Sequence, residues 1–225
     1  MPDHHALDNP IWAALTGPLA QYAEIRGEAA RFDPDISLLT ALGSDAGWDD
    51  LAALIGPDTE SFISGPFLDP PRGWAPLVRH PGVQLVGSGV RGEPDAEAVP
   101  LTEADNPEIL DLVARTRPGP FRDRTIDLGG YLGIRDGGAL VAMAGERLRV
   151  PGFTEISAVC TDPAYRGRGL AARLSLAVAA GIQARGNTPF LAALTANTGA
   201  VRLYERLGFK VRREVWFASL HTPAG

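Results

Sequence analysis

Residues 159–171 combine two arginines and two glycines between an apolar run and a helix-forming run. The apolar run, 156–160, is β-prone and ends at a Pro turn. A strand, a glycine loop and a helix in this order direct free backbone N–H groups and the helix dipole at an anion. Glycine lets the backbone approach a phosphate closely, and Arg166 and Arg168 add positive charge. The segment therefore predicts an anion-binding site.

The spacing of this loop differs from that of the common phosphate loops. Neither a complete Gly-x-x-x-x-Gly-Lys-Ser/Thr pattern nor a complete dinucleotide-binding pattern with its later acidic residue occurs. The sequence Arg166-x-x-Gly169-x-Ala171 instead resembles the pyrophosphate-binding motif of the GNAT superfamily of acyl-CoA N-acyltransferases. Taken alone, the pattern also fits a surface turn that precedes a helix.

A second segment, residues 197–209, strengthens the resemblance. It is similar to the Asn-x-x-Ala-x-x-Leu-Tyr-x-x-x-Gly-Phe segment of GNAT proteins. Asn197 can cap a short helix and Gly208 can end it. Asn197 and Tyr204 are two helical turns apart and therefore fall on roughly one face. The resemblance covers about residues 98–220 and is strongest from Glu155 onward.

The resemblance implies how the donor, acetyl-CoA, would be held. Backbone groups of the loop and of the following helix would bind the pyrophosphate, and main-chain groups of Val159 and Thr161 would bind the pantetheine arm. Asn197 would contact the coenzyme, although a pure helix cap would have the same sequence. The loop residues concerned are Arg166, Gly167, Arg168, Gly169, Leu170 and Ala171.

Two residues are predicted to be catalytic. By resemblance, Tyr204 is the general acid that protonates the departing thiolate; the alternatives are that it orients the sulfur or packs in the core. Glu155 is the candidate base, acting through water, because the period of two places 155, 157, 159 and 161 on one face. Alternatively, Glu155 is simply a charged residue at an exposed strand end. Glu146 on the preceding strand is a weaker candidate base.

Other reactive side chains favour structural interpretations. Cys160 has no histidine nearby and is predicted to face away from Glu155 as a small buried residue. Arg115 and Arg117 could bind a substrate carboxylate, or be solvated loop residues. The histidines lack metal-ligand spacing, so no metal site is predicted.

Composition limits the class of protein. The chain has 225 residues, 45% of them hydrophobic, which is enough for one large or two small domains. The net charge is −6 and no Lys/Arg block occurs, so nucleic-acid binding is not expected. No apolar run has the length of a membrane span, and the first residues lack signal-peptide features. A single cysteine fits a reducing cytoplasm.

The polar, Gly/Pro-bearing stretch 88–97 is the predicted linker between two domains. Residues 1–90 are expected to form a smaller N-terminal α/β domain, possibly a degenerate acyltransferase-like half. Its predicted helices are 10–31 and 48–55, and its predicted strands are 60–64, 75–79 and 83–87.

Residues 98–225 are expected to form the GNAT domain. Asp136-Gly137-Gly138 predicts a hairpin between strands 131–135 and 140–148. The remaining elements are strands 99–101, 154–161, 189–195 and 209–220, and helices 104–115, 169–185 and 198–207. This order predicts an α/β (α+β) fold with a mixed, mostly antiparallel central sheet flanked by helices.

These observations predict an enzyme: an acetyl-CoA-dependent N-acetyltransferase of the cytoplasm. It would transfer the acetyl group directly to a primary amine of a small molecule or a peptide, without a metal, a nucleic-acid partner or a membrane. The alternative is a non-catalytic acyl-CoA sensor or scaffold with the same fold. The sequence leaves the identity of the acceptor and the oligomeric state open.

Overall fold

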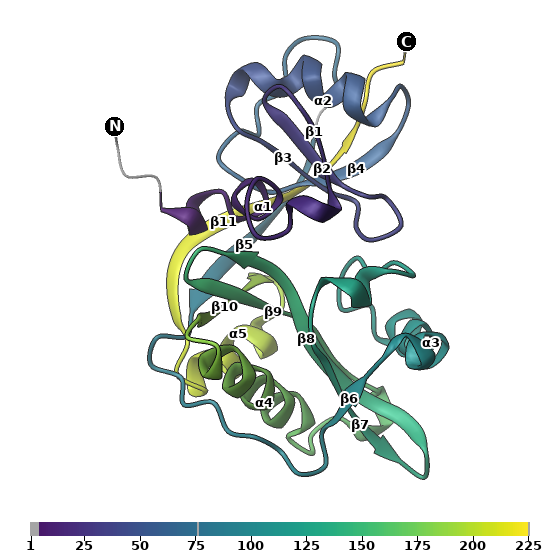
Figure 1. The fold of residues 1–225 in the computed structure, drawn as a ribbon, viewed down its shortest axis with the longest axis vertical. Coiled ribbons are helices and arrows are strands. Elements are labelled where there is room, and N and C mark those ends of the chain that lie inside the picture. Colours follow the sequence, from purple (N-terminus) through teal and green to yellow (C-terminus); the bar gives the residue numbers. More distant parts are fainter. Residues whose placement is uncertain (1–4, 76, 225) are drawn as a thin grey trace.

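The computed structural model describes residues 5–75 and 77–224. Residues 1–4 and 225, and residue 76 of the predicted strand 75–79, lie outside it. The described residues form one continuous 11-stranded sheet in the order β1-β2-β3-β4-β11-β5-β10-β9-β8-β7-β6 (Figure 1). Most neighbours are antiparallel, whereas β3 with β4 and β10 with β9 run parallel. The predicted mixed, mostly antiparallel sheet is therefore confirmed.

The strands are β1 (Ala23–Arg26), β2 (Ala29–Phe32), β3 (Leu39–Leu42), β4 (Glu60–Ile63), β5 (Val78–Val86), β6 (Val99–Leu101), β7 (Tyr131–Asp136), β8 (Ala139–Val150), β9 (Phe153–Thr161), β10 (Thr188–Leu194) and β11 (Lys210–His221). The α-helices are α1 (Pro10–Leu15), α2 (Trp48–Ile55), α3 (Asn106–Thr116), α4 (Leu170–Ala184) and α5 (Thr198–Arg206). Single 3-10 turns add η1 (Ala6–Asp8), η2 (Ala20–Tyr22), η3 (Asp45–Gly47), η4 (Glu103–Asp105), η5 (Thr125–Leu128) and η6 (Pro163–Tyr165).

The predicted hairpin joins β7 to β8. Gly137 and Gly138 form its two-residue turn with φ of 57° and 88°. Both angles lie in the left-handed region that such tight turns require and that glycine adopts without a steric cost. The sequence pattern thus places the turn correctly.

One predicted element of the N-terminal part, the helix 10–31, is wrong beyond its first turns. The helix α1 ends at Leu15, and the chain then builds the β1–β2 hairpin over residues 23–32. Gly17 and Pro18 follow the C-cap residue Thr16, and proline cannot continue a helix because it lacks an N–H group. The apolar residues beyond this break pack as a strand rather than a helix.

The strand β5 links the two parts of the chain. It lies between β10 and β11, although it precedes the predicted boundary at residue 90. The long strand β11 pairs with β5 and continues to pair with β4 (Figure 1). One strand of the C-terminal part therefore pairs with two strands of the N-terminal part. The sheet is continuous across the predicted boundary, and the division into 1–90 and 98–225 stays a prediction.

The predicted linker 88–97 is held against α4. Gly92 N–H donates to Gln183 Oε1 at 2.9 Å, and Glu93 N–H donates to the Leu176 carbonyl at 3.1 Å. A Cβ atom at Gly92 would lie 2.3 Å from the Ala180 nitrogen, so only glycine allows this close approach. The segment is an ordered strap rather than a free connection.

Two hydrophobic layers position the motif-bearing segments. Leu170, Leu174, Val178 and Ile182 of α4 are buried on one face of the sheet, as the helical spacing predicts. The helix α3 lies on the opposite face (Figure 1). Its residues Ile109 and Leu112 belong to one buried cluster with Tyr131. No helix in the described ranges has the length and apolar character needed to cross a membrane.

Candidate active site

The central feature of the site is a fork between β9 and β10. The two parallel strands pair only over Phe153–Glu155 and Thr188–Phe190. Beyond this point β10 pairs with β5 on its other edge, while β9 runs on to Thr161 paired only with β8. The inner edge of β9 from 156 to 161 therefore presents unpaired backbone groups, which suit an amide-bearing ligand. This edge contains the main-chain groups of Val159 and Thr161.

A β-bulge in β9 gives the fork its shape. Ala158 has φ of 53°, and the β8–β9 register shifts by one residue next to it, between the pairs at Met143 and Gly145. The extra residue reverses the alternation of side chains. Val159 packs with Ile156 under α4, whereas Ala158 and Cys160 pack on the α3 face. The prediction that Glu155 and Val159 share a face is therefore wrong, because the period of two does not survive the bulge.

An anion cradle lies at the beginning of α4, next to the fork. Gly167 and Gly169 have φ of 77° and 78°, and nothing lies within 4 Å of a Cβ atom built on either. The first helical bond runs from Arg173 N–H to the Gly169 carbonyl, and no side chain caps the helix. The N–H groups of the first turn, including those of Leu170 and Ala171, are thus free for an anionic group.

The arginines of the loop have different surroundings. Arg166 is exposed and lines the pocket; its Nε lies 3.5 Å from the Thr161 carbonyl. Arg168 is stacked over the Tyr165 ring at 4.6 Å from its centroid and is absent from the pocket lining. Of the two, Arg166 is therefore better placed to contact a bound phosphate.

One large pocket of about 930 Å³ joins the cradle and the fork to the N-terminal part of the chain. Of the residues predicted to bind or act on the donor, all except Arg168 line it. Its far wall consists of residues from η1, α1, β4, β5 and β11, among them Ile11, Phe62 and Phe217. The N-terminal part thus helps to enclose the space beyond the fork.

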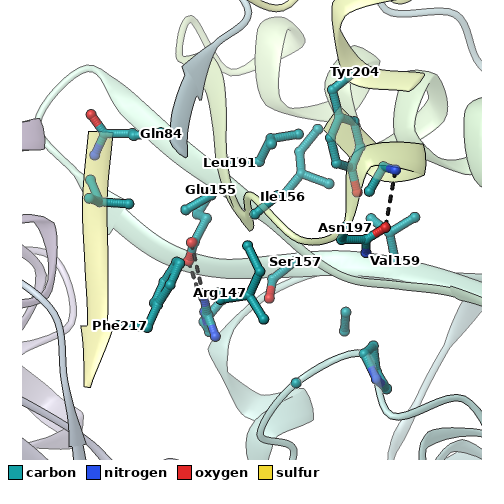
Figure 2. Close-up of a pocket in the computed structure, with 18 of the residues that line it drawn as sticks. Gln84, Arg147, Glu155, Ile156, Ser157, Val159, Leu191, Asn197, Tyr204 and Phe217 are labelled. Carbon is teal, nitrogen blue, oxygen red and sulfur yellow. Dashed lines mark hydrogen bonds and ion pairs between the residues drawn. The ribbon is translucent and has the colours of Figure 1, made fainter. Parts of the chain in front are cut away.

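Tyr204 projects from α5 into this pocket (Figure 2). Its ring packs edge-on against Phe209 with 5.9 Å between centroids, and its hydroxyl has no hydrogen-bond partner among the described residues. Burial, with a smaller contribution from Cys160, raises the pKa of Tyr204 to about 12. The hydroxyl is therefore a donor at neutral pH.

Asn197 begins α5 at the edge of the same pocket. Its Oδ1 accepts a hydrogen bond from the Ala200 N–H at 3.2 Å, so the predicted helix cap is confirmed (Figure 2). The side-chain amide group remains available to a ligand. The cap and the proposed coenzyme contact are therefore compatible.

Glu155 is the last residue of β9 before the fork opens, and it is buried. Arg147 of β8 donates to both of its carboxylate oxygens, from Nε at 2.8 Å and from Nη2 at 2.9 Å (Figure 2). The pair lines the pocket, so its charges are aimed at the reaction space. Both oxygens of the candidate base are thus engaged by a single guanidinium group.

The remaining candidates occupy other places. Glu146 is buried in an ion pair with Arg185 and does not line the pocket. Arg115 is paired with Asp111 and Asp162, whereas Arg117 lines the pocket mouth. Cys160 is buried, and burial raises the pKa of its thiol, as expected of a structural residue. The prediction that Cys160 faces away from Glu155 is wrong, because the bulge turns Cys160 to the α3 face. No group of three metal-binding side chains occurs in the part of the chain that the structure describes.

Sequence reasoning missed Arg147, Tyr131 and the N-terminal wall. Arg147 stands inside the strand Ala139–Val150, whose residues up to Glu146 are mainly buried. A charged residue in such a strand is a signal that it has a buried partner. The N-terminal wall had no comparable signal, because only the long-range pairing of β5 and β11 brings it to the pocket.

Thioester donors of the coenzyme A type need an anion site at one end and backbone hydrogen bonds along an extended arm. The cradle and the fork supply both, so the site defines the class of the protein as one that binds an acyl-CoA donor. Three comparisons with known proteins test this assignment.

A model of the family described as FR47-like protein matches residues 131–217. The N-alpha-acetyltransferase RimI of Mycobacterium tuberculosis is 42% identical over 121 residues, which is 49% of this chain and 75% of the relative. The crystal structure of a GNAT-family protein of Novosphingobium aromaticivorans is 40% identical, with a TM-score of 0.90 over 98% of this chain and all of the other. A GCN5-related N-acetyltransferase of Kribbella flavida, 18% identical, shares the fold over 96% of this chain and 95% of its own, with a TM-score of 0.62.

The chain therefore belongs to the GNAT family of N-acetyltransferases, and it is an acyltransferase enzyme. Members of this family use acetyl-CoA as their co-substrate. The open fork and the free N–H groups of α4 fit that molecule.

Proposed function

We propose that the protein transfers the acetyl group of acetyl-CoA directly to a primary amine of a small-molecule or peptide acceptor. The observation that carries this proposal is the Tyr204 hydroxyl. It is protonated, has no protein partner among the described residues, and faces the fork in which the thioester would lie. The name of the mycobacterial relative, an N-alpha-acetyltransferase, supports an amine acceptor.

The donor would be held by the cradle and by the inner edge of β9. Free N–H groups of the first turn of α4, with Arg166, would bind the pyrophosphate. Main-chain groups of Val159 and Thr161 would bind the pantetheine arm, and Asn197 would contact it from α5. Holding both reactants in one cleft replaces a bimolecular encounter by a positioned one.

In the transfer, the amine nitrogen bonds to the thioester carbonyl carbon, the carbon–sulfur bond breaks, and the amine proton is lost. Tyr204 would donate a hydrogen bond to the departing sulfur. A thiol has an ordinary pKa of about 8.5, below the value of about 12 for Tyr204. We therefore propose that Tyr204 stabilises the developing thiolate by its hydrogen bond and keeps its own proton, and that the thiolate takes up the proton that the nitrogen loses as it bonds to the carbonyl carbon.

Before the attack, the acceptor ammonium would lose a first proton to solvent through a water ordered by Glu155. Its two oxygens are engaged by Arg147, so it acts best as a fixed negative charge that attracts the ammonium and orients water.

We also propose a cytoplasmic location, supported by the free thiol of Cys160 and by the use of acetyl-CoA.

The test is an assay of free thiol release from acetyl-CoA with a panel of amines, combined with calorimetry of acetyl-CoA binding. We expect binding of acetyl-CoA and amine-dependent thiol release. Binding without release for every amine would contradict catalysis and leave an acyl-CoA sensor. Absence of binding would contradict the assignment of the cradle and the fork.

A further inference from the structure

Tyr131 carries a polar group that the proposed reaction does not use. It begins β7, its side chain is 2% exposed, and its hydroxyl has no hydrogen-bond partner in the described part of the chain. A buried hydroxyl without a partner costs free energy comparable to a lost hydrogen bond. Such a group is expected to have a partner in the working protein.

The ring of Tyr131 is held in one orientation. Phe121 packs edge-on against it with 5.6 Å between centroids and an interplanar angle of 83°. On β8, a Cβ atom at Gly145 would lie 2.2 Å from the ring, so the glycine makes room for it. Burial raises the pKa of the Tyr131 hydroxyl, which therefore remains a hydrogen-bond donor.

The surroundings of Tyr131 form a small cavity of about 10 Å³. Arg147, Ser157, Ala158 and the loop 118–121 line both this cavity and, except for Phe121, the large pocket, so the two adjoin. A space of this size holds about one water-sized atom. The cavity thus has room for a single oxygen atom, and the lining residues it shares with the large pocket place the two side by side.

Two further donors border the cavity. Arg147 uses Nε and Nη2 for Glu155, and its Nη1 has no hydrogen-bond partner among the described residues. The Ser157 hydroxyl likewise has no protein partner there, and it points to the same side as Arg147 (Figure 2). Three hydrogen-bond donors therefore border the cavity, from Tyr131, Arg147 and Ser157.

We infer that Tyr131, Arg147 and Ser157 bind the carbonyl oxygen of the acceptor, next to the amine that is acetylated. Glu155 already neutralises Arg147 and the amine that attacks is neutral, so a full carboxylate on the acceptor would bring an uncompensated negative charge into a buried site. A neutral amide carbonyl carries no such cost. The acceptor class is then an α-amino amide, as in an amino-acid amide or the N-terminus of a peptide.

The position of the ion pair agrees with this class. Its carboxylate end attracts the ammonium and its guanidinium end meets the carbonyl, so both groups of the acceptor contact one buried pair. An amine and a carbonyl joined through a single carbon are close enough together to do this. The inference rests on the proposed function, because it concerns the acceptor of that same reaction.

The experiment compares three acceptors of one carbon skeleton in the thiol-release assay: alaninamide, alanine and isopropylamine. Each rate is divided by the concentration of the unprotonated amine at the pH of the assay. We expect kcat/KM for alaninamide to exceed that for isopropylamine about tenfold or more, the effect of one or two hydrogen bonds. We expect alanine to be a poorer acceptor than alaninamide.

Two variants locate the effect. Tyr131→Phe and Ser157→Ala are each expected to lower kcat/KM for alaninamide about three- to tenfold and to leave isopropylamine unchanged. The control is Tyr22→Phe, which removes a hydroxyl that donates to the Asp127 carbonyl away from the pocket. It is expected to affect neither acceptor.

Several results would overturn the inference. Equal turnover of alaninamide and isopropylamine by the native enzyme would do so and leave the proposed function intact. An equal loss for both acceptors in Tyr131→Phe and Ser157→Ala would show a structural cavity instead of a subsite. Thiol release with none of the amines would contradict the proposed function itself.

Discussion

Glu155 and Phe190 form the last residue pair between β9 and β10 before the strands separate. The candidate base therefore lies at the closed end of the fork, and the unpaired backbone that would hold the donor begins at the next residue. Glu155 and this unpaired backbone belong to the same strand, β9. The strand therefore sets the distance between the acidic side chain and the arm of a bound donor.

Removing the hydroxyl of Tyr204 should impair transfer more than binding. In Tyr204→Phe we expect kcat to fall about a hundredfold, as when one donor to a developing negative charge is lost. The dissociation constant of acetyl-CoA, measured by calorimetry, should change little, since the cradle and the β9 edge are intact. Unchanged kcat would exclude a role of the hydroxyl in the transfer.

Two glycines allow a matched test of the cradle. Gly169 and Gly186 have φ of 78° and 79°, and nothing lies within 4 Å of a Cβ atom on either. Tryptophan at either position should cost about 1–2 kcal/mol of unfolding free energy, because L-residues are strained there. Only Gly169→Trp should weaken acetyl-CoA binding, by about tenfold or more. Equal weakening by Gly186→Trp would indicate a general loss of structure.

The buried pair of Arg147 and Glu155 predicts non-additive stability. Arg147→Met or Glu155→Gln alone should lower the unfolding free energy by about 3–5 kcal/mol, since each leaves a buried group without its partner. The double variant should be more stable than the less stable single one in urea unfolding. Simple additivity of the two losses would contradict a coupled pair.

Acid should loosen the strap over α4. Hydrogen bonds from Arg173 lower the pKa of Asp95 from its ordinary 3.8 to about 2. A lowered pKa means that the charged form stabilises the fold above the ordinary pKa, and that this contribution is lost as the pH falls from about 4 towards 2. We expect Asp95→Asn to flatten the pH dependence of the melting temperature in this window. Asp111→Asn, in an exposed pair with Arg115, serves as the control and should leave the profile unchanged.

The pairing of β5 predicts that residues 98–225 do not fold alone. Without residues 78–86, β10 and β11 would lose their shared neighbour and expose two unpaired edges. Circular dichroism and solubility of the fragment, compared with the full chain, provide the measurement. A soluble, cooperatively melting fragment that binds acetyl-CoA would support the boundary predicted between residues 90 and 98.

Local patterns in the sequence were sufficient for much of the donor side. The Gly137-Gly138 turn, the spacing of apolar residues in α4 and the cap by Asn197 each depend on residues close together in the chain. Such features follow from backbone sterics and helix periodicity, which act over a few residues. The predicted helix 10–31 ends early because Gly17 and Pro18 interrupt it, and the residues beyond them pair as the β1–β2 hairpin.

Only the tertiary structure decided the acceptor side. The bulge at Ala158 reversed the alternation of β9, β5 crossed the expected boundary, and Arg147 met Glu155 from the neighbouring strand. These relationships join residues through sheet register and packing, for which a single sequence carries no local signal. By itself the sequence therefore determined the cradle, α4, α5 and the family they resemble. The face of each β9 side chain and the walls of the pocket beyond the fork depend on how distant strands pair.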